Sequence, residues 1–187
     1  MTADGRGPGV GCRVNKEPEP AMNPILEHVR DHLVKFTLVP HVAGDGEAMA
    51  VQVTLTHVVS TLVFQADMDP PLLSVSARVP VLVPAERRAA VVEFFMRINH
   101  GLRVGRFLLD YQDGEACLRM EVEADVANLT DQIISRYVLL CMRLVDGYFP
   151  ALMNVIYRGT SPVQAVEQGE AEYAAVTTKG QEEEREA

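Results

Sequence analysis

The chain has 187 residues, of which 48% are hydrophobic and 23% are charged, and its formal net charge is −9. This length and composition fit one ordinary soluble domain with extensions and argue against wholesale disorder. No basic stripe interrupts the acidic balance, so the sequence predicts no binding to a nucleic-acid backbone.

The sequence also bears on location and cofactors. It has no run of roughly 18 uninterrupted apolar residues and no apolar signal segment at its start. We therefore expect a cytoplasmic protein without a membrane span. Cys12, Cys117 and Cys141 have unrelated spacings that match neither a disulfide framework nor a zinc site. We interpret them as buried or idle thiols and expect no cofactor and no metal.

Composition divides the chain into three parts. Residues 1–21 are rich in Gly and Pro, which predicts a disordered leader. A domain is expected over residues 22–159, because Asn23 and Pro24 form a helix cap and a proline at the first helical position. Met22 directly precedes this cap, so Met1 and Met22 are both candidate initiators. Residues 160–187 are rich in Glu, Gln, Ser and Thr and predict an acidic disordered tail.

The first half of the domain predicts one helix and a meander of strands. Apolar residues recur at helical spacing over residues 24–35, which predicts an amphipathic helix. Alternating apolar and polar residues over 50–55 and 61–66 predict two half-buried strands. After a proline-containing turn at 67–71, a third strand is expected over residues 72–83.

A second helix is predicted over residues 84–99, followed by a hairpin. If Asp113 and Gly114 form a two-residue turn, the strands before and after it pair so that one face is apolar. On the other face Arg106 would lie opposite Glu121. The expected apolar pairs are Phe107 with Met120, Leu109 with Leu118, and Tyr111 with Ala116.

The last helix of the domain is predicted to begin after Thr130, whose hydroxyl is a suitable cap. It carries a broad apolar stripe, the largest apolar surface in the sequence. Gly147 and Pro150 are expected to kink or interrupt it. A short closing helix over residues 151–157 would then pack back on the fold.

Several residues resemble parts of functional sites. His28 and His32 have a spacing that would put two imidazoles on one helix face for a metal, but the more economical interpretation is two exposed polar residues. Acidic residues at 67–69 and 110–115 are interpreted as turn formers. The sequence contains no nucleophile elbow, Cys-His signature or dinucleotide-binding glycines, which lowers the expectation of an enzyme.

Five motifs occur in order along the second half of the domain, namely Val81–Arg88, Phe94–Asn99, Gly105–Asp110, Asp113–Glu115 and Gly147–Leu152. With them the chain resembles the bacterial YbjN domain family over about residues 24–159. This resemblance implies an α+β fold similar to class I type III secretion chaperones, with a twisted antiparallel sheet of about five strands, helices packed on it, and the order α-β-β-β-α-β-β-α. It also implies a chaperone-like partner-binding role, a dimer, and the label of a sensory transduction regulator.

The leading functional hypothesis is a non-catalytic adaptor or chaperone-like homodimer that binds a polypeptide, with a role in stress or signalling regulation. Val63, Leu72 and Leu108 are the candidate contact residues, because they are apolar on otherwise polar strand faces. Strand addition at a sheet edge and an apolar groove are both open as binding modes. The alternatives are a small-ligand sensor with a cavity between sheet and helices and, third, an enzyme with a scattered site.

Overall fold

The computed structural model describes residues 22–123 and 127–186. Helices and strands follow one another as α1 (Pro24–Lys35), β1 (His41–Val42), β2 (Ala48–Thr54), β3 (Val59–Met68), β4 (Pro71–Arg78), the 3-10 turn η1 (Ala85–Arg87), α2 (Arg88–Gly101), β5 (Arg106–Leu109), β6 (Ala116–Glu123), α3 (Asp131–Met153), the π-helical turn η2 (Asn154–Arg158) and α4 (Pro162–Glu186).

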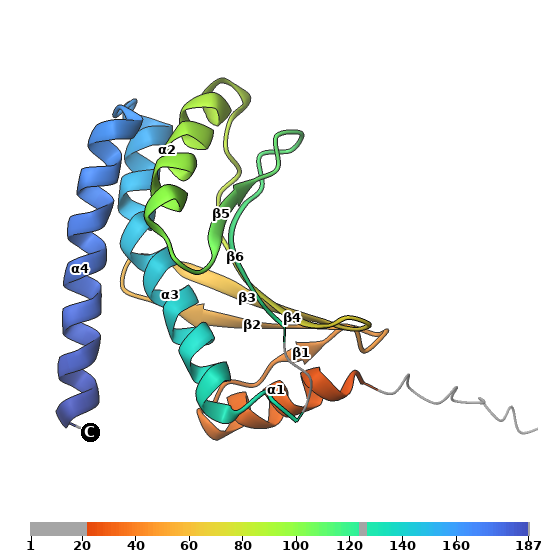
Figure 1. Ribbon diagram of the computed structural model, residues 1–187. Coiled ribbons are helices and arrows are strands. Elements are labelled where there is room, and N and C mark those ends of the chain that lie inside the picture. The colour runs from red at the N-terminus through yellow and green to blue at the C-terminus, as the bar shows by residue number, and fades with distance from the viewer. Residues whose placement is uncertain (1–21, 124–126, 187) are drawn as a thin grey trace, which may run out of the picture.

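The six strands form one antiparallel sheet in the order β1-β2-β3-β4-β6-β5. The helices gather on one side of it, with α4 as the outermost layer (Figure 1). The predicted α+β class and antiparallel sheet are therefore confirmed. The sequence predicted five strands, and the sixth is β1, which has only two residues and is too short to show an alternating pattern.

The hydrophobic core lies between the sheet and α3. Alternate residues of β3 and β4 point to this side, so Leu62, Phe64 and Val75 have almost no exposed surface. The helix α3 contacts both β4 and β6, and α1 packs against α3 and β3. Ten residues of α3 are buried, which makes it the main apolar partner of the sheet.

Both predicted helix caps are present. The Asn23 side chain accepts a hydrogen bond from the backbone of Ile25 at 2.9 Å, and its amide donates to the carbonyl of Ala66 on β3 at 3.1 Å. Thr130 accepts from the backbone of Ile133 at 3.3 Å. These side chains satisfy backbone donors that a helix start otherwise leaves unpaired. The expected bounds of α1 are those observed.

The predicted interruption of the last helix is wrong, and a kink there stays a prediction. The helix α3 continues through Gly147 and Pro150 to Met153 and passes into the π-helical turn η2, which ends at Gly159 with a left-handed backbone. No separate closing helix forms over residues 151–157. Proline removes one backbone donor, but surrounding buried contacts hold the helix together here.

The predicted disordered tail is also wrong from Pro162 onward, because α4 occupies residues 162–186 and packs on α3 and α2. Its close approach depends on two glycines. A Cβ atom at Gly147 would lie 2.6 Å from the Cα of Tyr173, and one at Gly169 would lie 2.4 Å from the ring of Tyr148. The predicted leader over residues 1–21 lies outside the described residues.

Aromatic rings connect four elements across this helical layer. Phe95 of α2 stacks on Phe107 of β5, with ring centroids 5.2 Å apart. Phe107 meets Tyr148 of α3 edge-on at 5.7 Å, and Tyr148 stacks on Tyr173 of α4 at 5.9 Å. Such ring pairs add to the stability that their burial provides. They join α4 to the body of the fold.

The hairpin of β5 and β6 has a different register from the predicted one. Asp110 pairs with Glu115 across a four-residue loop, so Phe107 lies opposite Leu118 and Leu109 opposite Ala116. The apolar face is as predicted, because the shift is two residues and preserves the side of each residue. The pairs are not, and Arg106 lies opposite Arg119 rather than Glu121.

The four-residue loop has a local cause. The carboxylate of Asp110 accepts from the backbone of Gln112 at 2.8 Å, and that of Asp113 accepts from Glu115 at 2.7 Å. These bonds shape the loop in place of a two-residue turn. Gly114 has φ of 89°, and a Cβ there would lie 2.3 Å from the carbonyl oxygen of Val83.

The strand predicted over residues 72–83 is β4, which ends at Arg78 rather than Val83. Residues 79–83 leave the sheet and run beside the hairpin, where Val79 donates to the carbonyl of Ala116 at 2.9 Å and Val83 donates to that of Gly114 at 2.8 Å. Pro80 lies between these two bonds and has no backbone donor, so a regular ladder cannot continue.

The two sheet edges differ. At the β5 edge, the side-chain amide of Asn99 in α2 donates to the carbonyl of Phe107 at 2.9 Å and accepts from its N–H at 2.8 Å. At the opposite edge, β1 pairs with β2 only at Met49 and Ala50. Within the described chain, the outward backbone groups of Gln52 and Thr54 have no strand beside them.

The segment Asp131–Arg158 is long and apolar enough, by length and composition, to cross a membrane. However, 56% of its most apolar window is buried inside the fold. The core helix of a globular domain satisfies the same test, and the contacts of α3 with the sheet account for its apolar character here.

We predict that Gly147→Ala lowers the free energy of unfolding by about 1–3 kcal/mol, because the added methyl group overlaps the backbone of α4 and forces the helices apart. Urea unfolding measures this change. Gly101→Ala is the matched control, since a Cβ at that helical glycine meets no atom within 4 Å. Equal stabilities of the two variants would contradict the close approach of α3 and α4.

Candidate functional site

The side of the sheet that faces away from the helices carries a groove. Because residues alternate along each strand, Thr61, Val63 and Gln65 of β3 share this side with Ser76 and Arg78 of β4. Cys117 and Arg119 of β6 and Leu108 of β5 continue it across the sheet. We call this side the open face.

The groove on the open face has a volume of about 650 Å³. Its floor is formed by β3, β4, β6 and β5, and the segment 79–82 and the start of the β5–β6 loop form its walls. Arg88 of α2 holds these walls together, because its guanidinium donates to the carbonyls of Val83 at 3.2 Å and of Tyr111 at 2.9 Å. Leu82 is 61% exposed at the rim.

The structure places two of the three candidate contact residues in this groove. Val63 and Leu108 both line it, although they lie on strands separated by β4 and β6. Leu72 is on the open face but outside the groove lining, between Asp67 and Glu123 on the neighbouring strands. Partner binding by these residues stays a prediction. The sequence did not indicate the contribution of residues 79–82, which it assigned to a strand.

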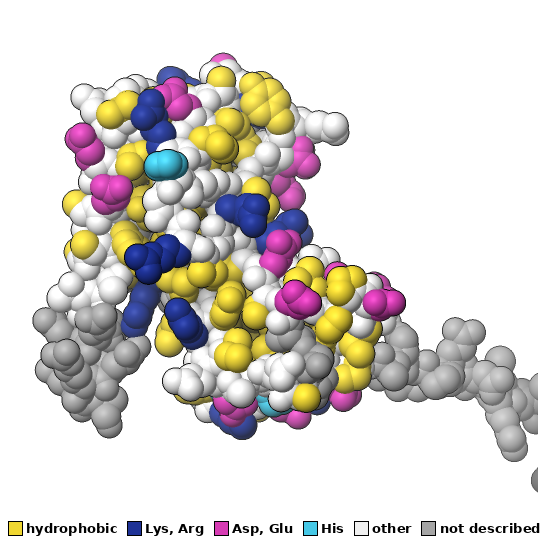
Figure 2. All heavy atoms as spheres, in the orientation of Figure 1, with side chains coloured by type: hydrophobic (Ala, Val, Ile, Leu, Met, Phe, Trp, Pro, Cys, Tyr) yellow, Lys and Arg dark blue, Asp and Glu magenta, His cyan; other side chains and the backbone are white. Residues whose placement is uncertain are grey.

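Three arginines occupy neighbouring positions on the open face. Arg106 and Arg119 are direct cross-strand partners, and Arg78 lies opposite Cys117, one pair along. We call Arg78, Arg106 and Arg119 the arginine cluster. In the described part of the chain no carboxylate forms an ion pair with any of them. Figure 2 shows one face of the molecule in the orientation of Figure 1, on which basic and acidic side chains are interspersed with hydrophobic ones.

Cys117 lies within the arginine cluster. Burial raises the pKa of its thiol, while the nearby charges of Arg119 and Arg78 act in the opposite direction. Cys141, on α3, is fully buried, and burial raises the pKa of that thiol to about 12. Both thiols are free. A protonated thiol is a weak nucleophile, so neither cysteine has the environment of a reactive residue.

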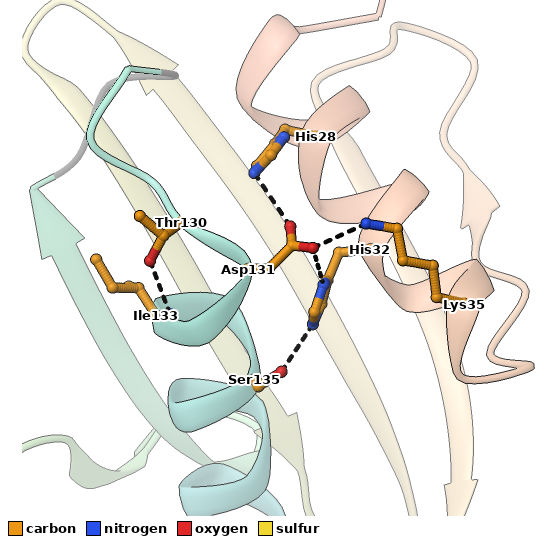
Figure 3. A network of polar contacts seen from close by, with 7 residues as sticks. All are labelled: His28, His32, Lys35, Thr130, Asp131, Ile133 and Ser135. Atoms are coloured by element: carbon orange, nitrogen blue, oxygen red, sulfur yellow. Dashed lines mark hydrogen bonds and ion pairs between the residues drawn. The ribbon is translucent and has the colours of Figure 1, made fainter.

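A second polar cluster joins α1 to the start of α3 (Figure 3). The carboxylate of Asp131 lies 2.8 Å from Nζ of Lys35, 3.4 Å from Nδ1 of His32 and 3.6 Å from Nε2 of His28. Nε2 of His32 lies 2.8 Å from the Ser135 hydroxyl. The expectation of two exposed histidines is wrong for His32, which is only 5% exposed.

This cluster docks two helices rather than forming a metal site. The described residues contain no group of three or more His, Cys, Asp and Glu side chains placed to hold a metal ion. The hydrogen bond from Lys35 is the main cause that lowers the pKa of the Asp131 carboxyl, and His32 contributes in the same direction. A carboxylate in the first turn of α3 also suits the positive end of the helix.

A third polar contact fixes the turn between β2 and β3. Asp146 of α3 is buried, and its carboxylate accepts hydrogen bonds from the backbone of His57 at 2.7 Å and of Thr56 at 3.2 Å. The His57 ring lies 3.6 Å from the same carboxylate. This pairing of Asp and His resembles part of a catalytic triad, but the carboxylate is occupied by the two backbone donors that it orients.

The fold and site define an α+β protein whose sheet is covered by helices on one face and carries an open groove on the other. The chain belongs to the YbjN family, described as a putative bacterial sensory transduction regulator, whose model matches residues 25–153. The match ends before η2 and α4. Comparison with curated proteins finds none that matches.

We predict that Lys35→Met raises the pKa of the Asp131 carboxyl toward its ordinary value, because the largest cause of its lowering is removed. In the wild type this lowered pKa contributes stability above about pH 4, which is lost as pH falls through the folded-state value. NMR titration of the Asp131 carboxyl and thermal unfolding at several pH values measure both effects.

The control for this prediction is Arg30→Met, because Arg30 pairs with Asp31 on the exposed side of α1. It should leave the Asp131 titration unchanged. If Lys35→Met also leaves it unchanged, then Lys35 does not hold the carboxylate in solution.

Proposed function

We propose that this protein is a non-catalytic, chaperone-like adaptor that binds a polypeptide partner in the groove on the open face. The groove itself is the observation that carries the proposal. A half-covered sheet ordinarily exposes polar residues on its free side. Here Val63, Leu108 and Leu82 supply apolar contacts at a concave surface. The regulatory description of the family supports a role in which the protein acts through a partner.

The dimensions of the groove favour an extended chain. It crosses four adjacent strands, β3, β4, β6 and β5. Neighbouring strands are about 4.8 Å apart, so the floor is roughly 14 Å wide, enough for about four residues of extended polypeptide. The small-ligand alternative required a cavity between sheet and helices. The residues at that position, including Leu62, Phe64 and Val91, have no exposed surface and belong to the hydrophobic core.

A non-catalytic role agrees with the arrangement of the titratable groups. Asp146 binds the β2–β3 turn, and Asp131 docks α1 on α3. Cys117 and Cys141 both have raised pKa values. Each of these candidates for chemistry therefore has a structural contact or an unreactive state that accounts for it.

We further propose a homodimer formed at the β1 side of the sheet. The unpaired stretch of β2 lies at this edge, and Phe36, Val39 and Val42 are 60%, 69% and 43% exposed just before and within β1. Exposed apolar groups beside a free edge suit pairing with a second copy. A reducing cytoplasm is the proposed location, and the free thiols Cys117 and Cys141 are compatible with it.

The double substitution Val63→Gln and Leu108→Gln tests the groove without changing its charge. Loss of two apolar contacts of about 1–1.5 kcal/mol each should weaken partner binding about tenfold or more. Affinity purification from the native host, quantified by mass spectrometry, should recover a specific polypeptide with the wild type and little of it with the double variant.

Val59→Gln is the matched control, because Val59 is exposed on the same face of β3 but lies outside the groove. It should recover as much partner as the wild type. Circular dichroism establishes that the variants are folded. The proposal fails if no polypeptide is enriched with the wild type, or if the double variant retains the same partner at the same level.

A further inference from the structure

The arginine cluster is a local arrangement that folding alone does not favour. Arg106 and Arg119 lie directly opposite each other on antiparallel strands. Like charges at such positions repel and destabilise the sheet, whereas an opposite charge would stabilise it. Glu121 is only two residues further along β6, yet the register places it opposite Ser74 on β4. The hairpin therefore holds two positive charges directly opposite each other. Asp110 and Glu115 line the neighbouring groove, but among the described residues neither forms an ion pair with these arginines.

Arg78 adds a third positive charge to the same place. It lies opposite Cys117, which is two residues before Arg119 on β6 and on the same face of the sheet. The charges of Arg78 and Arg119 both act on the Cys117 thiol, so both guanidinium groups lie near it. The whole chain carries a net charge of −9, so this concentration of positive charge runs against its overall composition.

We propose that the arginine cluster binds carboxylates of an acidic segment in the partner polypeptide. This inference rests on the proposed function and names the chemistry of the partner. A guanidinium group is planar and can donate two parallel hydrogen bonds to one carboxylate. An acidic segment would also remove the repulsion between Arg106 and Arg119, so binding would gain energy that the free protein lacks.

The apolar part of the groove adds a spacing requirement. Val63 and Arg119 share one row of the sheet and are separated by β4 alone, so they lie about 9.6 Å apart across the strands. In the polyproline II conformation three residues rise about 9 Å and return a side chain to the same side of the chain. A segment in this conformation that runs across the strands would therefore place an apolar side chain on Val63 and an acidic one, three residues away, on the arginine cluster.

Fluorescence anisotropy with three labelled twelve-residue peptides tests this inference on the full chain. Each peptide has Leu in a Ser-Gly background, with Glu, Gln or Lys three residues from it. We expect the Glu peptide to bind about tenfold more tightly than the Gln peptide, the Lys peptide not to bind, and the binding of the Glu peptide to weaken as salt increases.

Arg119→Gln is the decisive variant because it should move binding and stability in opposite directions. The Glu peptide should bind at least about tenfold more weakly, while the melting temperature should rise by about 1–3 °C as the repulsion from Arg106 is relieved. Arg136→Gln, at an exposed position of α3, is the matched control and should leave Glu-peptide binding unchanged. A lower melting temperature for Arg119→Gln would show that Arg119 stabilises the fold, and would count against the inference.

Three outcomes separate this inference from the proposed function. If the groove variant Val63→Gln with Leu108→Gln loses the partner but Arg119→Gln keeps both partner and Glu peptide, the groove binds a polypeptide without the acidic preference, and the inference fails alone. If neither variant loses the partner, both fail. If an oligonucleotide or a phosphopeptide displaces the Glu peptide at lower concentration than the unlabelled Glu peptide does, the cluster binds phosphate, and the inference is overturned.

Discussion

The packing of α3 across β4 and β6 is the contact on which the rest of the structure depends. Apolar residues of α3 and of the alternate positions of the strands bury one another, and this burial is the main favourable contribution to folding. Polar contacts then set the position of α3 along the sheet. Asp131 at its start binds α1, and Asp146 near its end binds the β2–β3 turn. The helices α1 and α4 both pack directly on α3.

Burial on one face leaves the other face free for recognition. The sequence can place apolar and charged groups there with little effect on the core, because successive side chains of a strand point to opposite sides. The groove uses this freedom in two ways. Val63 and Leu108 provide apolar contacts, and Arg78 and Arg119 bring positive charge to the groove, where Arg119 lies opposite Arg106 at a cost to the sheet. Interactions that oppose stability are found where another requirement, such as binding, outweighs it.

Local chemistry was readable from the sequence, and contacts between distant segments were not. The caps at Asn23 and Thr130 depend on residues within three positions, so both were predicted correctly. The faces of the β5–β6 hairpin followed from alternation, but its register depended on carboxylate bonds inside the loop, and the arginine pair was missed as a result.

The helix α4 shows the same limit. It reads as a polar tail because only a narrow stripe faces the fold, with Ala165, Gly169 and Tyr173 spaced four residues apart. That stripe packs on Gly147 and Tyr148 of α3, a contact between segments that are distant in the sequence. Two residues of the family motifs also make contacts between separate elements. Gly147 allows α4 to approach α3 closely, and Asn99 covers the edge of β5.

The side chain of Asn99 has a consequence for assembly. Its amide occupies the outward backbone groups of Phe107, as an additional strand would, and so closes the middle of one edge of the sheet to any other chain. Among the described residues, the longer run of unpaired edge backbone is then that of β2. Copies that can pair through a single edge form a closed pair and cannot polymerise, because each pairing uses up the edge that the next would need. The proposed homodimer at the β2 edge would therefore stop at two copies rather than grow into a fibre.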